Sequence, residues 1–549
     1  MTDIAFDTVH DALLARGFQQ AGTIRPITYS GPLQVGSESV PVQMEIWDID
    51  LQGLPIIRLL DRPTWIPATC NHVDARNIVC YAVNGAAFID RYRADQQVLY
   101  CLDRAARTLN DIRHGNVLGD VNQEFGYYWH GEPIFVDAER YESKQILDVV
   151  RLKLADREVA VLIDPQQDAL KKYAGYSPVK QELQSAILIP STNTPPADGQ
   201  HWPPTTLEEF LKWLSAHSPE LARSIRESLA GLNGLRVQRA LLVFQTEPVW
   251  FGIGFRVPPA VGQVNFRHDR SFVERLEARS ARLKLERYTP IRIDSDYLVR
   301  RNLRKDEEPL LGKRVVLAGC GAIGGHLAHA LARAGAGFNS GALFLVDPDN
   351  LGAGNLGRHR QGFEGLLLRK ADCIAAELQR SLPGINVRSV IGSVLDLHLR
   401  DFDLIVDATG EEQLSEALNA RFLAGQSAPL IFSWIVGNGL AVQSFTLSST
   451  KLGCLRCWKS HGSLASYAPA EREQAEIRIG RGCDDPFVPF NGSSPLLAAG
   501  LALQATIDWA SGRPTPTLRT IQIDYKSTHH IKPKSPKKTA KCPACGANS

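Results

Sequence analysis

The chain has 549 residues, with 61 Lys and Arg against 59 Asp and Glu. Its net charge of +2 gives no electrostatic reason to expect binding to nucleic acid or to a membrane surface. No apolar run approaches the roughly 20 residues that a membrane helix needs, and ten cysteines are too few for a disulfide scaffold. We therefore expect a cytoplasmic protein of about two to four domains that contacts neither nucleic acid nor membrane.

The first segment, residues 1–145, opens with an amphipathic pattern that predicts a helix over 3–16. Alternating apolar stretches at 40–47 and 55–60 are typical of a small antiparallel meander. A proline-bearing loop follows, then Cys80 at the end of a short extended piece, then a second helix from residue 95.

This order resembles the ubiquitin-conjugating (UBC) fold, in which a cysteine after a His-Pro-Asn loop carries a thioester. The resemblance implies an α+β UBC-like domain in which Cys80 is the acyl-carrying thiol. The corresponding loop reads Cys70-Asn71-His72, so three side chains remain alternatives for stabilising an oxyanion: Asn71, His72 and Asn77. The alternative for Cys80 is a small buried apolar residue without chemistry.

The middle segment, residues 146–288, has strand-like runs at 158–163, 186–189, 240–244 and 250–255. A helical pattern begins near 206, with Thr205 or Thr206 as its cap and an acid soon after. A charged helix over 270–287 is expected to join this segment to the C-terminal half. The pattern predicts a small α/β linker or docking domain without chemistry of its own.

The third segment, residues 289–549, contains a glycine turn. An apolar strand at 315–318 runs into Gly319, Gly321 and Gly324, and a helix is predicted over 326–334. This G-x-G-x-x-G pattern directs backbone N–H groups and a helix N-terminus toward one point, most often a nucleotide phosphate. A second strand at 342–346 ends in Asp347, at the distance where an acid meets a ribose hydroxyl.

Two further polar residues distinguish between the enzyme classes that use such a turn. Asn355 and Arg358 follow closely after Asp347. A dehydrogenase has no need of an Asn and an Arg there, whereas an enzyme that grips ATP phosphates does. The dehydrogenase alternative is therefore the weaker hypothesis.

These parts resemble the ThiF/MoeB family and the adenylation domains of ubiquitin-activating enzymes. The family signature Asp-x-Asp-x-Val-x-x-x-Asn-Leu-x-Arg-Gln corresponds to residues 347–359, with Leu351 in place of Val and His359 in place of Gln. The resemblance implies a Rossmann-like adenylation domain and a homodimer. An arginine before the glycine turn, Arg300 or Arg301, is a candidate for reaching ATP.

The resemblance also assigns roles to polar residues around the turn. Asp347 would hold the ribose, Asn355 and Arg358 the β- and γ-phosphates, and Lys370 the ribose or the phosphates. Asp407, at the end of the strand 404–407, would bind Mg²⁺ beside the α-phosphate. Such groups position a carboxylate for attack on ATP and neutralise the developing charge, which is what formation of an acyl-adenylate requires.

Two C-x-x-C pairs lie near the end of the chain. Cys454 with Cys457, and Cys542 with Cys545, supply four thiolates that suit tetrahedral Zn²⁺. The adenylating family has the same arrangement, so we expect a closed structural zinc site. A redox dithiol is the alternative, but no thioredoxin-like context surrounds either pair.

Another cysteine, Cys483, lies in a polar, glycine-bearing stretch between the first of these pairs and an apolar helix predicted over 495–510. Ubiquitin-activating enzymes carry their transfer cysteine in a crossover loop at this place. Arg481 would favour the thiolate there, whereas Asp484 and Asp485 would oppose it. The alternative is a loop thiol without function.

The combination resembles the bacterial fusion enzymes of CBASS anti-phage operons. The implied reaction adenylates a partner's C-terminus with ATP and Mg²⁺, passes the acyl group to Cys483 and then to Cys80, and joins it to a target lysine. The partner would be a cGAS-like nucleotidyltransferase or a ubiquitin-like protein. One alternative is an activator of a sulfur carrier that performs no ligation, and another is an adenylating scaffold whose N-terminal domain is an inert recognition module.

Overall fold

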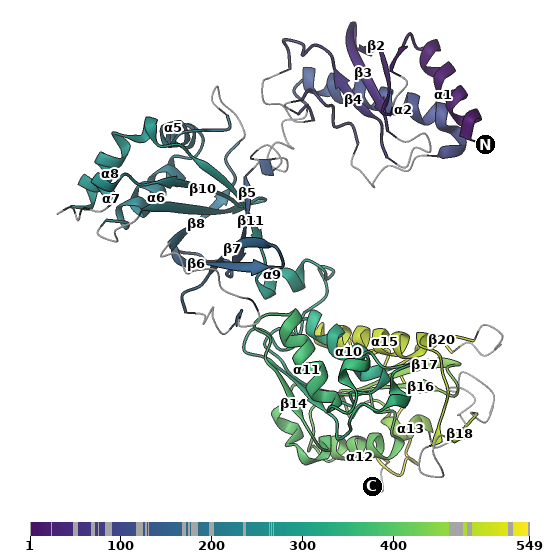
Figure 1. Ribbon diagram of the computed structural model, residues 1–549. Helices are drawn as coiled ribbons and strands as arrows, with labels where there is room; N and C mark the ends of the chain where they lie inside the picture. The colour runs from purple at the N-terminus through teal and green to yellow at the C-terminus, as the bar shows by residue number, and fades with distance from the viewer. Residues whose placement is uncertain are drawn as a thin grey trace.

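In a computed structural model, each third of the described chain forms its own main sheet, and a separate two-stranded sheet lies near residues 478–487 (Figure 1). The structure describes residues 2–22, 25–47, 53–66, 72–74, 76–82, 90–116, 125–126, 129, 131–166, 172–173, 176, 185–196, 202–233, 238–262, 264, 266, 268–459, 476–479, 486–524 and 531–546. Across these residues, every helix falls short of the length and apolarity that crossing a membrane requires.

The first sheet is the predicted antiparallel meander, in the order β1-β2-β3-β4. The second helix packs on it because Val98, Leu102 and Leu109 form a buried stripe at helical spacing. The elements are α1 (Thr2–Ala15), β1 (Gln19–Gly22), β2 (Ile27–Val35), β3 (Glu38–Ile46), β4 (Ile56–Leu59), η1 (Arg91–Arg93) and α2 (Ala94–Arg113). The helix and meander predictions are confirmed, while membership in the UBC fold stays a prediction.

The middle of the chain forms a closed barrel in the order β10-β11-β5-β7-β6-β8-β9, covered by helices. Thr206 caps α5 through a capping box with Glu209, as its sequence predicts. The strands are β5 (Glu132–Asp137), β6 (Gln145–Leu154), β7 (Arg157–Ile163), β8 (Ser185–Asn193), β9 (Arg239–Glu247), β10 (Phe251–Arg256) and β11 (Glu286–Arg292). The helices are α5 (Leu207–His217), α6 (Pro219–Ala230), α7 (Pro259–Gly262), α8 (Asp269–Glu277) and η2 (Ser280–Arg282).

The barrel differs from the sequence expectation in its last part. The predicted helix over 270–287 ends at Glu277, where the Ser280 hydroxyl donates to the Glu277 carbonyl at 2.6 Å. The chain then enters β11, which pairs with β10 and β5. Because β5 and β11 extend to either side of residues 146–288, the barrel is larger than that segment; the division into three domains stays a prediction.

The C-terminal sheet has seven strands in the order β14-β13-β12-β15-β16-β17-β20. Its first five strands are parallel, β17 runs antiparallel to β16, and β20 runs antiparallel to β17. Helices cover both faces, with α10 and α15 on one side and α12 and α13 on the other (Figure 1). The predicted α/β class is confirmed, and the crevice beyond the carboxyl ends of β12 and β15 is where such sheets bind ligands.

The strands of this half are β12 (Arg314–Ala318), β13 (Ala342–Val346), β14 (Val387–Val390), β15 (Leu404–Asp407), β16 (Leu430–Val436), β17 (Ala441–Leu447), β18 (Arg478–Ile479), β19 (Pro486–Phe487) and β20 (Leu518–Gln522). The helices are α9 (Ser295–Arg300), α10 (Ala322–Arg333), α11 (Lys370–Ser381), α12 (Glu412–Leu423), α13 (Leu455–Lys459) and α15 (Ser493–Ala510). Short 3₁₀ turns are η3 (Ala353–Asn355), η4 (Phe363–Gly365), η5 (Val394–Asp396) and η6 (Leu399–Asp401).

Candidate functional site

A cavity of about 1010 Å³ opens at the carboxyl ends of the central parallel strands. It brings together four of the residues that the sequence singled out, Gly319, Gly321, Asp347 and Lys370. Its far side is apolar and aromatic, with contributions from β16, α13 and the segment after β19. The cavity therefore has a polar end at the glycine turn and an apolar end beyond β15.

The glycine turn forms the polar end of the cavity. At two of its positions the backbone conformation or the lack of space requires glycine. Gly319 has a φ of +86°, a conformation that favours glycine. A Cβ at Gly324 would lie 1.8 Å from the Gly319 carbonyl oxygen, so only glycine lets α10 approach the turn this closely. At Gly321 a Cβ would meet nothing within 4 Å, so this glycine leaves open space where the turn lines the cavity.

Asp347 is fixed by backbone donors of two different segments. Its carboxylate accepts from the N–H of Cys320 at 2.7 Å and from the N–H of Asp349 at 2.8 Å. The side chain is buried and still lines the cavity. The carboxylate thus joins the glycine turn to the end of β13.

Lys370 begins α11, and its ammonium group forms an ion pair with Asp349 at 2.8 Å. Lys370 is largely buried, whereas 64% of the Asp349 side chain is exposed. Both residues line the cavity. A cation held at the cavity wall by an exposed acid is available to a phosphate that displaces this acid.

Asn355 and Arg358 lie beside the cavity and are not among the residues that line it. The Asn355 side-chain oxygen accepts from the Gly352 N–H at 2.9 Å, which closes the turn η3. The Arg358 guanidinium lies over the rings of Phe487 and Phe490, at 5.6 and 5.2 Å from their centroids. Phe490 lines the cavity, so Arg358 stands directly behind the cavity wall.

Asp407, at the end of β15, lies beneath the cavity and is 1% exposed. Its carboxylate accepts from the Thr409 N–H at 3.0 Å, the Thr409 hydroxyl at 2.6 Å and the Ser415 hydroxyl at 2.6 Å. Thr409 and Ser415 both line the cavity. A carboxylate is a ligand that Mg²⁺ accepts, but this one does not itself line the cavity, and its neighbours Thr409 and Ser415 do.

The two arginines before the glycine turn do not line the cavity. Arg300 pairs with Asp296 at 2.9 Å and Glu308 at 3.5 Å, and these contacts raise the pKa of its guanidinium. The Arg301 guanidinium lies 5.8 Å from the ring centroid of Tyr297. Neither arginine is therefore placed at the candidate ATP site of its own chain.

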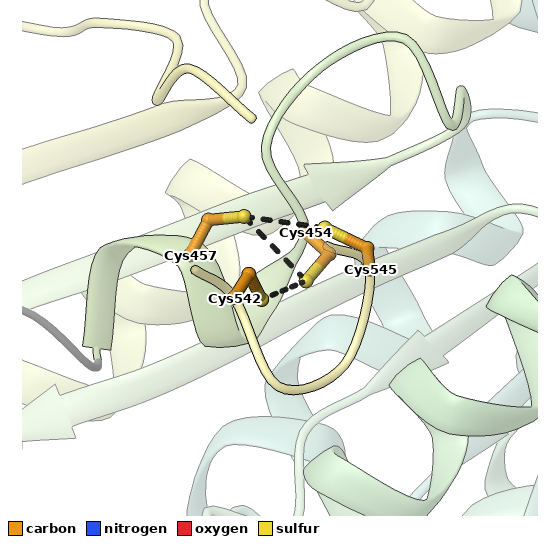
Figure 2. Close-up of side chains that lie close together, drawn as sticks. All are labelled: Cys454, Cys457, Cys542 and Cys545. Atoms are coloured by element: carbon orange, nitrogen blue, oxygen red, sulfur yellow. Dashed lines mark hydrogen bonds between the residues drawn. The ribbon is translucent and has the colours of Figure 1, made fainter. Parts of the chain in front are cut away.

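The four predicted zinc ligands do come together (Figure 2). Their sulfur atoms lie within 4.8 Å of one another, and all four side chains are buried. The Sγ atoms of Cys454 and Cys457 are 3.9 Å apart, those of Cys454 and Cys542 3.7 Å, and those of Cys457 and Cys545 3.3 Å. A tetrahedral ion with Zn–S bonds of about 2.3 Å places its sulfurs about 3.8 Å apart, so the cluster fits a four-thiolate metal site.

Burial favours the protonated form of one thiol in this cluster, so a metal that binds there must displace its proton. Burial raises the pKa of the Cys545 thiol to about 11, so the thiol would stay protonated near neutral pH without a metal. Cys454 immediately precedes α13, and Cys457 lies within that helix. A metal here would fix α13, which places Leu455, Arg456 and Trp458 on the cavity wall.

Cys80 is exposed, in contrast to the alternative of a buried apolar residue. Its N–H donates to the His72 carbonyl at 2.7 Å, which closes a tight loop. Asp74 holds that loop by accepting from the N–H groups of Arg76 and Ile78 at 2.8 and 2.7 Å. Asn77 has a φ of +62°, and its side-chain oxygen accepts from Arg62 at 3.1 Å.

Several sequence candidates fall outside the described residues. They are Cys70, Asn71, Arg481, Cys483, Asp484 and Asp485. The six residues 480–485 separate β18 from β19 in the chain, and these two strands pair with each other. The chain on either side of the stretch that contains Cys483 is therefore described, and the role of Cys483 stays a prediction.

Three contributors to the site could not be assigned a role from the sequence. Asp349 was signalled as the second acid of the Asp-x-Asp pair, but its partnership with Lys370 depends on the fold. His359 was noted only as a departure, and the structure places its Nε2 2.6 Å from the Cys320 carbonyl oxygen. Trp434, whose ring stacks on Trp458 with centroids 5.6 Å apart, carried no sequence signal.

Comparison with known proteins agrees with these features. The ThiF family model matches residues 297–545. An ATP-dependent ubiquitin transferase-like protein Cap2 of Pseudomonas aeruginosa (strain BWHPSA011 / Pa011) is 32% identical over 502 residues, which cover 90% of each chain. The protein of the same description from Vibrio cholerae serotype O1 is 24% identical over 521 residues, covering 85% of each.

Among solved structures, that of E. coli MccB with ATP is 19% identical and covers 52% of this chain and 74% of its own, with a TM-score of 0.33. A similarity this low carries no argument about the present chain. The similarity to the Cap2 protein of P. aeruginosa is much greater, because it extends over 90% of both chains. The chain belongs to the family of ATP-dependent ubiquitin transferase-like proteins, and its residues 297–545 form a ThiF domain.

Proposed function

We propose that the chain activates the C-terminal carboxylate of a partner protein with ATP and joins it to a lysine of a target. The observation that carries this proposal is the cavity in which the glycine turn, Asp347 and Lys370 meet. These groups suit a nucleotide: backbone N–H groups and a lysine for phosphates, and a carboxylate for the ribose. The apolar end of the same cavity offers room for the end of a polypeptide.

In the first step, a carboxylate oxygen of the partner attacks the α-phosphorus of ATP, and pyrophosphate leaves. Lys370 and Arg358 would neutralise the phosphates, with Asn355 as a further phosphate ligand. Asp407 would hold Mg²⁺, which supplies charge neutralisation beside the α-phosphate. The product is an acyl-adenylate, in which AMP has become the leaving group.

In the transfer steps, the Cys483 thiolate attacks the acyl carbon and AMP leaves, which forms a thioester. The Cys80 thiolate then attacks that thioester and releases Cys483. A lysine amine of the target attacks last, which forms an amide, releases Cys80 and loses a proton. The exposure of Cys80 and the helix–meander–loop order before it support a UBC-like role for residues 1–145.

We place this reaction in bacterial CBASS defence, with a cGAS-like nucleotidyltransferase or a ubiquitin-like protein as the activated partner and a homodimer as the working form. Zn²⁺ is the structural metal proposed for Cys454, Cys457, Cys542 and Cys545. The Cap2 description of the relatives, ATP-dependent ubiquitin transferase-like, supports the general class of reaction.

The test is ATP–pyrophosphate exchange by the full chain, with each protein encoded beside its gene as the candidate partner. A partner that drives exchange should also form an adduct with the chain that thiol reductants remove. C80A should leave exchange intact and keep the adduct on Cys483, whereas C483A should leave exchange intact and abolish the adduct. C373S is the matched cysteine control and should change neither exchange nor adduct. Absence of exchange with every candidate would contradict the proposed function.

A further inference from the structure

Both backbone polar groups of Cys320, the central residue of the glycine turn, are held by side chains. Its N–H donates to the Asp347 carboxylate at 2.7 Å, and its carbonyl oxygen lies 2.6 Å from Nε2 of His359. Cys320 itself is fully buried. The turn is therefore clamped from two directions, by the acid after β13 and by the histidine after Arg358.

The direction of the histidine bond follows from its second partner. The N–H of Gln361 donates to Nδ1 of His359 at 3.2 Å, so Nδ1 accepts and the proton of a neutral ring lies on Nε2. Burial lowers the pKa of His359 and keeps the ring neutral. In this tautomer Nε2–H donates to the Cys320 carbonyl.

Holding this carbonyl also orients the next amide. In a planar trans peptide, the carbonyl of Cys320 and the N–H of Gly321 point to opposite sides. Gly321 lines the cavity, and within the described chain its N–H donates to no protein acceptor. Such an N–H is what a phosphate oxygen binds, and its direction depends on the His359 bond.

His359 also belongs to the turn that carries the other phosphate candidates. The N–H groups of His359 and Arg358 donate to the Asn355 carbonyl at 2.8 and 3.0 Å. The bond from His359 to Cys320 therefore joins this turn to the glycine turn. One side chain sets the spacing between two groups of proposed phosphate ligands.

We propose that His359 is a positioning residue for ATP, which holds the Cys320 carbonyl so that the Gly321 N–H and the Asn355–Arg358 turn face the same triphosphate. The inference rests on the proposed function, because it assumes that ATP occupies this cavity. It also accounts for His359 standing where the family signature has Gln. Both side chains have an N–H that can donate to the Cys320 carbonyl.

The test is ATP·Mg²⁺ affinity, measured by calorimetry on the full chain, with thermal unfolding recorded beside it. H359L leaves the buried carbonyl without a donor and should weaken ATP binding about tenfold. H359Q should stay within about threefold of the parent, since its amide N–H can donate, whereas the shorter side chain of H359N should weaken binding as H359L does. H329L is the matched control, a buried histidine of α10 outside the glycine turn, and should leave ATP affinity unchanged.

If H359L, H359Q, H359N and H329L all bound ATP as tightly as the parent and differed only in melting temperature, the inference would be overturned. His359 would then be a packing residue. If H359L does not fold, the comparison of H359Q with H359N replaces it. Weaker ATP binding by H359N alone supports the inference, and equal binding by both variants overturns it. A parent chain that binds no ATP would instead contradict the proposed function, so the two failures are distinguishable.

Discussion

The guanidinium of Arg358 lies 5.2 Å from the ring centroid of Phe490, at the wall of the cavity. Among the described residues no carboxylate pairs with Arg358, so the aromatic ring holds the guanidinium while its charge stays available to an anion. A cation–π contact contributes about 0.5–1 kcal/mol at a partly exposed site. F490L should therefore weaken ATP binding about two- to fivefold, and R358K should weaken it more, because lysine cannot bind a phosphate through a planar fork.

Calorimetric titration of both variants with ATP checks this prediction. F490Y keeps a ring face beneath the guanidinium and is the control, expected to match the parent. Equal binding by F490L and the parent would show that Arg358 does not depend on Phe490.

The ion pair between Lys370 and Asp349 should contribute little to protein stability, whereas Lys370 itself should be needed for ATP binding. Because Asp349 is 64% exposed, the pair adds little to the free energy of unfolding. D349N should therefore leave the melting temperature nearly unchanged, while K370A should reduce ATP–pyrophosphate exchange at least about tenfold by removing a phosphate partner. If K370A lowered the melting temperature and left exchange intact, Lys370 would be a structural cation.

Removal of the metal should loosen one wall of the cavity. The chain should contain one zinc ion by elemental analysis, and C457S should lower both its zinc content and its free energy of unfolding, the latter by at least about 2 kcal/mol. Because Trp458 follows Cys457 on α13 and stacks on Trp434, tryptophan fluorescence should change on chelation. C373S, a cysteine outside the cluster, should keep the metal; full zinc content in C457S would contradict the four-thiolate site.

Acidification should destabilise the C-terminal half through three histidines, of which His329 and His359 are buried and His326 is half-buried. Burial lowers the pKa of His326, His329 and His359 below the ordinary value of 6.5. As the pH falls through 6.5 the unfolded chain takes up protons before the folded chain, so the free energy of unfolding is constant above this range and decreases below it. The melting temperature should therefore decrease between about pH 7 and pH 5.5, and H329Q should reduce that decrease; a melting temperature that rises on acidification would contradict the assignment.

Features encoded in short stretches were predictable from the sequence. The glycine turn, the two C-x-x-C pairs and the cap at Thr206 each depend on residues within a few positions of one another, and the structure shows all three. The pairing of strands distant in sequence was not predictable. Tyr288 of β11 lies opposite Glu132 of β5, and such a contact leaves no local pattern.

The candidate site shows the same division. Asp347 and Lys370 were identified because their neighbours carry a family motif, and both line the cavity. The bond from His359 to Cys320 joins residues 39 positions apart, and the stacking of Trp434 on Trp458 joins a strand to a helix. Such contacts depend on how the sheet and helices pack, so they required the structure.

A trap at Cys80 tests the proposed acyl transfer between the two cysteines most directly. Lysine at this position would convert an arriving acyl group into a stable amide instead of a thioester. C80K, with a C80K/C483A double variant beside it, is expressed in the native cell, purified, and analysed by intact mass and peptide mapping. We expect a mass gain on residue 80 that identifies the partner by its C-terminal peptide and that disappears in the double variant. No gain on residue 80, from a chain that still exchanges pyrophosphate with ATP, would contradict the transfer to Cys80.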